Sequence, residues 1–224
     1  MASRTALMER KLPDYTRNEE IFNMVSHIIG GAFGVLSLVL CLVKSVKYGS
    51  PWQIAGGAIF SIDMILLYTM SSIYHGLRPS LAKKVFQVID HCTIYFLIAG
   101  SYTPVLITGL RNYNPRLSWS VFAVVWFMCV FGTVFTAIDL KKYRVLSMIC
   151  YLTMGWSVIV FIKVILAAFP RDFLIFLISG GLSYTVGVIL YGIGSKRRWF
   201  HSVFHIFVVF GSVLQFVGIY LYCV

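Results

Sequence analysis

Charged residues are scarce in this chain. Only 12% of its 224 residues are charged, whereas 59% are hydrophobic. Soluble domains carry about 25% charged residues and about 45–50% apolar residues. The composition therefore excludes an ordinary soluble globular protein and indicates an integral membrane protein.

Several familiar signatures are missing as well. The five cysteines show no Cys-x-x-Cys or other metal-ligand spacing, so we interpret them as reduced packing residues. There is no Gly-x-Ser-x-Gly motif, and no serine pairs clearly with a histidine, which argues against a serine hydrolase. No cleavable signal peptide is apparent, because the first twenty residues are polar and the apolar run after them is too long.

Long hydrophobic runs are what the chain has instead. A membrane-spanning helix needs about 20 apolar residues, and seven runs meet this requirement. We predict an all-α, seven-helix transmembrane bundle over residues 21–224, preceded by a cytoplasmic tail over residues 1–20. The expected spans are 21–43, 52–75, 86–110, 118–138, 146–168, 173–194 and 199–222.

The basic residues predict the orientation of this bundle. The net charge is +11, and thirteen of the nineteen Lys and Arg fall on one side of the membrane. By the positive-inside rule that side is cytoplasmic, so the N-terminus is expected inside and the C-terminus outside, in the cell membrane. We assign the charge to anionic lipid headgroups, not to nucleic acid. The inner set is Arg4, Arg10, Lys11, Arg17, Arg78, Lys83, Lys84, Lys141, Lys142, Arg144, Lys196, Arg197 and Arg198.

Polar residues gather at the inner ends of the spans. The span order places His75 at the inner end of the second span and Asp90 in the first turns of the third. His201 and His205 fall in the first two turns of the seventh span. Burying such groups in hydrocarbon costs several kcal/mol unless they are paired or bound to a metal. We therefore expect them to form one site.

The residue types of this site favour zinc. His201 and His205 are four residues apart, so both imidazoles project from one helical face. His75 supplies a third nitrogen, and three histidines with one open position form a catalytic type of zinc site. Ser71, one turn from His75, is predicted to hydrogen-bond a ligand or the attacking water. Asp90 is predicted to orient that water or to accept its proton.

Each of these residues also has an ordinary structural interpretation. His75 alone fits an interfacial histidine, Asp90 fits a charge favoured by a helix N-terminus, and Ser71 fits a hydroxyl bonded to its own helix. A pair of histidines four apart also occurs by chance. The combination of three histidines and one acid at a single depth favours the metal site.

Other polar residues stand outside this set. Glu20-x-x-Asn23-x-x-x-His27 begins the first span, and we favour a hydrogen-bonded cluster tying the tail to the bundle over a role in supporting or ligating the metal. His91 points about 100° away from Asp90 and is not expected to be a ligand. Asp63, near the middle of the second span, is expected to be neutral or to pair with Lys163.

These motifs resemble those of the progestin and adipoQ receptor superfamily, and most closely its bacterial hemolysin III branch. The stretch from Asp90 to Pro104 and the stretch from Tyr151 to Trp156 are also similar to that branch, and the likeness covers residues 17–223. Adiponectin receptors and alkaline ceramidases belong to the same wider group. The resemblance implies that His75, His201 and His205 bind zinc, that Asp90 contacts the zinc-bound water and that Ser71 lies nearby.

The function expected from these observations is a zinc-dependent hydrolase of lipid amides or esters, whose substrate enters from the bilayer. Two alternatives come from the resemblance: a sensor of membrane lipids and a cytolytic protein. The sequence itself leaves open a structural zinc that clamps the helices together. In each case the expected partner is membrane lipid, and nucleic acid is not expected.

Overall fold

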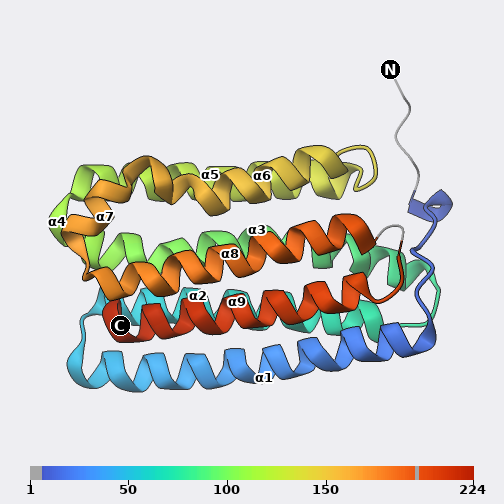
Figure 1. Ribbon diagram of the computed structural model, residues 1–224, viewed down its shortest axis with the longest axis horizontal. Helices are drawn as coiled ribbons and strands as arrows, with labels where there is room; N and C mark the ends of the chain where they lie inside the picture. The colour runs from blue at the N-terminus through green and yellow to red at the C-terminus, as the bar shows by residue number, and fades with distance from the viewer. Residues whose placement is uncertain (1–6, 195–196) are drawn as a thin grey trace.

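The computed structural model describes residues 7–194 and 197–224, which form a bundle of long helices (Figure 1). Seven helical segments are long and apolar enough to cross a membrane, so the predicted all-α membrane bundle is confirmed. Arg4 and Lys196, two of the basic residues used to predict the orientation, lie outside the described residues. Five spans are single helices: α1 (Arg17–Tyr48), α2 (Pro51–Gly76), α5 (Pro115–Ile138), α8 (Arg171–Gly194) and α9 (Phe200–Tyr222).

The third and fifth spans are each interrupted. Pro104 lacks a backbone N–H, and the helix that contains it passes into a π-helical turn, where the Thr108 hydroxyl donates to the Pro104 carbonyl at 2.6 Å. The third span comprises α3 (Leu81–Val105), η2 (Leu106–Leu110) and α4 (Arg111–Tyr113). The fifth comprises α6 (Arg144–Trp156), the 3-10 turn η3 (Ser157–Phe161) and α7 (Ile162–Ala168).

The first helix begins four residues before the span expected at 21–43. Thr16 caps it, because its hydroxyl accepts the backbone N–H of Glu19 while the Glu19 carboxylate accepts the backbone N–H of Thr16. This reciprocal pair satisfies two of the free donors at a helix start. Glu19 and Glu20 therefore belong to α1 and have fixed positions within the bundle.

The buried face of α1 is made of small and polar residues. A Cβ added at Gly30 would come within 2.9 Å of the Tyr68 ring, so α1 and α2 approach each other closely there. Tyr68 in turn donates a hydrogen bond of 2.6 Å to the hydroxyl of Ser212, which joins α2 to α9. These contacts hold α1, α2 and α9 together. The buried residues of α1 are Glu19, Asn23, His27, Gly30, Gly34, Ser37, Cys41 and Ser45.

The helices lie side by side, with α1 at one edge of the bundle and α5 and α6 at the opposite edge (Figure 1). The N-terminal segment, meaning here residues 7–16, includes the short 3-10 helix η1 (Leu7–Glu9) and runs across the end at which α2 finishes and α9 starts. The same end therefore carries the polar residues that the sequence places in one layer.

Asp63 packs against the backbone of α3 in the middle of the bundle. A Cβ added at Gly100 would overlap the Asp63 carboxylate, and the Oδ2 atom has no hydrogen-bond partner among the described residues. No ion pair between Asp63 and Lys163 is found in the part of the chain that the structure describes. Gly100 is thus needed for the close approach of α2 and α3.

Replacing Gly100 with alanine is therefore expected to destabilise the protein by about 1–3 kcal/mol, because one methyl group overfills a packed contact. Thermal unfolding in detergent measures this as a lower melting temperature. The same substitution in an Asp63→Ala background should cost much less, since the obstructing carboxylate is gone. An equal cost in both backgrounds would contradict the contact.

Candidate metal centre

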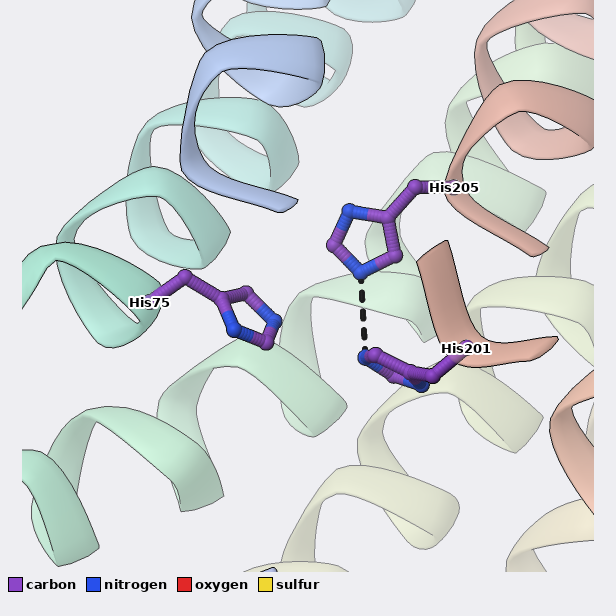
Figure 2. A group of neighbouring side chains, drawn as sticks. All are labelled: His75, His201 and His205. Carbon is purple, nitrogen blue, oxygen red and sulfur yellow. Dashed lines mark hydrogen bonds between the residues drawn. The ribbon is translucent and has the colours of Figure 1, made fainter. Parts of the chain in front are cut away.

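Three histidines from two helices meet at one end of the bundle (Figure 2). His75 lies at the end of α2, and His201 and His205 lie in the first two turns of α9. All three side chains are buried, and each offers one ring nitrogen that lies within 4.8 Å of the other two. The ring of His75 points toward the two rings of α9. The structure therefore brings together the three ligands predicted from the sequence.

The spacing of the nitrogens fits a metal ion. The Nε2 atoms of His201 and His205 are 3.1 Å apart. Zinc–nitrogen bonds of about 2.0–2.1 Å in a tetrahedral site place two ligand nitrogens about 3.3–3.4 Å apart. The Nε2 atom of His75 is buried and has no hydrogen-bond partner among the described residues, which leaves its lone pair for a metal. This donor set suits zinc.

An acid from α1 orients His75. The Nδ1 atom of His75 lies 2.6 Å from the carboxylate of Glu20, so Nδ1 carries the proton and Nε2 faces the site. The other oxygen of Glu20 pairs with the ammonium of Lys83 at 2.8 Å. Lys83 also donates to the carbonyls of Tyr74 and Leu77 at the end of α2. A carboxylate behind a ligating histidine is the usual support of a zinc site.

The neighbouring acid of α1 holds the start of the helix that carries His201 and His205. Glu19 accepts the backbone N–H of Trp199 at 2.6 Å, immediately before α9 begins. Trp199 has a φ of 66°, a left-handed conformation that is strained in a bulky residue and needs support from its surroundings. Glu19 and Glu20 thus hold the start of α9 and the end of α2, respectively.

Asn23 and His27, one and two turns further along α1, lie behind His205. The Ser26 hydroxyl, which donates to the Asn23 backbone carbonyl at 3.0 Å, lies 3.5 Å from the Nδ1 atom of His205. The rings of His27 and His205 stack, with centroids 3.7 Å apart and an interplanar angle of 19°. The sequence favours a cluster that ties the tail to the bundle, and in the structure Glu20 and His27 also contact histidines of the candidate site. His27 is outside the three-histidine group found among the described residues.

Asp90 and Ser71 lie together beside the histidines. Asp90 is in the third turn of α3, and the Ser71 hydroxyl of α2 is a hydrogen-bonding neighbour of its carboxylate. Both residues line the same cavity as His201 and His205. His91, the next residue, directs Nδ1 to the Gln87 carbonyl at 2.8 Å and Nε2 to the Tyr191 hydroxyl at 3.2 Å. His91 therefore has partners at both ring nitrogens and lies outside the three-histidine group found among the described residues.

A tyrosine from the N-terminal segment covers the site. The ring of Tyr15 stacks on that of His201, with centroids 4.9 Å apart and an interplanar angle of 18°. It also lies 5.9 Å from the ring of His75. Burial, together with the nearby Tyr191 and Glu20, raises the pKa of the Tyr15 phenol, so the hydroxyl stays protonated. Tyr15 thus shields two ligands from water.

Two of the three histidines, His201 and His205, line a large cavity of about 830 Å³. At one end it is lined by the polar residues of the site and by the N-terminal segment. From there it extends between α3, α6, α8 and α9 past Tyr102 toward Gln215. Its walls along this path are mostly apolar, including Ile94, Leu97, Met148, Val188 and Phe204. The shape and chemistry suit a polar group near the histidines with an apolar chain behind it.

Sequence reasoning missed two of these residues and did not identify the partners of three others. Tyr15 precedes the first helix and carries no spacing signal, so only the path of the N-terminal segment reveals it. The sequence analysis uses Lys83 only as one of the basic residues that predict the orientation of the bundle, but its side chain is buried and pairs with Glu20. The spacing of Glu20, Asn23 and His27 on one helical face was a usable signal, although it did not identify their partners.

Comparisons with known proteins agree with this architecture. The family model for Haemolysin-III related proteins matches residues 15–216. The Hemolysin-3 homolog of Bacillus subtilis (strain 168) is 36% identical over 210 residues, covering 94% of this chain and 97% of the relative. Hemolysin-3 of Bacillus cereus is 31% identical over 204 residues, covering 91% of each. The adiponectin receptor protein of Drosophila melanogaster is 26% identical over 221 residues, covering 89% of this chain and 50% of that protein.

Proposed function

Because this chain belongs to the Haemolysin-III related family of multi-pass membrane proteins, we propose that its three-histidine group holds a catalytic zinc ion for hydrolysis of a lipid amide or ester. The main support is that His201 and His205, two members of the three-histidine group, line the wall of the cavity. A zinc ion that only clamped helices together would be expected to have four protein ligands. Here the three histidines leave room for a substrate.

The cavity also supports a lipid substrate. Its polar end contains His201, His205, Asp90 and Ser71, whereas its interior lies between apolar helix faces. A lipid carbonyl could reach the histidines while its acyl chain stays in apolar surroundings. Such a substrate never has to leave the membrane. This accounts for a site that lies at the ends of the membrane-spanning helices α2 and α9.

The roles of the residues follow from their contacts. His75, His201 and His205 would bind zinc, which polarises a carbonyl and lowers the pKa of water when bound in such a site. The Asp90 carboxylate would accept the proton of the attacking water and pass it to the leaving group. Ser71, beside Asp90, would orient that carboxylate. Tyr15 would exclude bulk water from the site.

Removal and return of the metal test this proposal. Purified protein in detergent should release fatty acid from a ceramide or a lysophospholipid, and dialysis against a chelator should abolish the release. Zinc added back should restore it, whereas magnesium should not, because three imidazoles suit zinc. Release that persists in metal-free, folded protein would contradict a metal-dependent hydrolase.

A further inference from the structure

The cavity has a mouth with more basic than acidic residues, at the end near His201 and His205. Its lining includes six basic residues and four acidic ones, and one of these acids, Asp90, belongs to the candidate metal centre. Another, Asp14, lies 3.9 Å from Arg198. The basic residues are Arg10, Lys11, Lys141, Arg144, Arg197 and Arg198. Exposed basic residues are expected on the inner face of a membrane protein, so charge alone assigns no site.

Arg10 differs from these surface charges because it is buried, with only 7% of its side chain exposed. Its Nη2 atom donates to the Ile138 carbonyl at 3.3 Å and lies 3.9 Å from the Asp139 carboxylate. The Nε and Nη1 atoms have no hydrogen-bond partner among the described residues. Leaving buried N–H groups of a charged side chain unpaired is costly. A guanidinium with unpaired N–H groups on two of its nitrogens is well suited to bind the oxygens of a phosphate.

Arg144 extends the basic surface toward the metal centre. Its guanidinium lies over the ring of Tyr191, 5.6 Å from the ring centroid. Tyr191 in turn lies 5.7 Å from the ring of His201, and its hydroxyl contacts His91. Cation–π contact holds an arginine in place while leaving its N–H groups available. Arg144 is therefore positioned between the mouth of the cavity and the histidines.

We propose that the cavity takes a single-chain lipid with an anionic phosphate headgroup, which Arg10 and Arg144 bind at the mouth. The apolar walls beyond the histidines accommodate the acyl chain, which favours a lipid over a small soluble phosphate. The carbonyl that joins headgroup and chain then lies at the histidines. This last placement rests on the proposed hydrolase function, whereas headgroup binding stands on the two arginines alone.

Binding of two matched lipids tests the proposal. The probes are 1-palmitoyl-lysophosphatidic acid and 1-monopalmitoylglycerol, which share the acyl chain and glycerol and differ by the phosphate. Native mass spectrometry of the full-length protein in neutral detergent measures their binding. We expect the phosphate lipid to bind at least about tenfold more tightly, as charge-assisted hydrogen bonds predict. Arg10→Gln and Arg144→Gln should each remove most of this preference.

Lys142→Gln is the matched control, because Lys142 lies in the same turn as the basic mouth but outside the cavity lining. It should leave the preference unchanged. Equal binding of the two lipids would overturn the proposal, and so would a Lys142→Gln effect as large as that of Arg10→Gln. Glycerol 3-phosphate competing as well as the lipid would also overturn it, since the site would then bind a soluble phosphate. If Arg10→Gln fails to fold, the Arg144→Gln comparison decides alone.

The binding readout separates this proposal from the hydrolase. Arginine-dependent binding of the phosphate lipid without any hydrolysis would support the headgroup site and contradict the proposed hydrolase reaction. Hydrolysis of 1-monopalmitoylglycerol, with equal binding of both lipids, would support the hydrolase reaction and contradict the headgroup site.

Discussion

Asp90→Asn is expected to lower lipid hydrolysis by roughly 100- to 10,000-fold while the protein keeps its zinc. Asparagine preserves the size of the side chain and its contact with Ser71, but it cannot accept a proton from water. Asp90 is not among the three residues that could hold the metal, so metal content should not change. The measurement pairs turnover of a lysophospholipid with elemental analysis of the same sample.

Asp63→Asn provides the matched control for this substitution. Asp63 is also an acid buried within a span, but it packs against Gly100 and does not line the cavity. Its amide variant should hydrolyse lipid at the wild-type rate. Wild-type turnover in Asp90→Asn would exclude Asp90 as the base, and loss of zinc in that variant would assign it to the metal instead.

Glu20→Gln should weaken zinc binding by about 10- to 100-fold, the usual effect of removing a carboxylate behind a ligating histidine. The amide loses the charge that keeps the proton on Nδ1 of His75 and that pairs with Lys83. The tautomer of His75 that carries its proton on Nδ1 and directs an unprotonated Nε2 to the site is then less favoured. Competition with a chromophoric chelator measures the affinity directly.

Asp172→Asn is the control for Glu20→Gln, because Asp172 is an exposed acid in the first turn of α8. That variant should bind zinc as the wild type does. Equal zinc affinity in Glu20→Gln and the wild type would show that the carboxylate only anchors α1. An equal loss in both variants would show that overall charge controls metal binding.

Hydropathy alone was sufficient to predict the seven spans, because each run is about as long as the hydrocarbon is thick. The direction of successive spans then placed His75, His201 and His205 at one depth, and helical periodicity placed two of them on one face. This reasoning needed no knowledge of which helices are neighbours. It brought the three histidines together because all of them lie at span ends.

The supporting contacts could not be predicted in the same way, since they depend on how particular helices approach each other. The Glu20–His75 contact requires α1 to pack closely on α2, which the Gly30–Tyr68 contact allows. Likewise, the position of Asp63 against Gly100 depends on the crossing of α2 and α3. Tyr15 belongs to a segment without helical periodicity, so no pattern indicated that it stacks on His201.

Metal content tests the central claim most directly. Protein purified without chelator should contain about one zinc per chain by mass spectrometry, and His201→Ala/His205→Ala should contain none. His91→Ala, which removes a histidine near the site but outside the ligand group, should keep its zinc. Folded wild-type protein without metal, or a double variant that retains it, would contradict the account and leave the three histidines as a buried polar contact between α2 and α9.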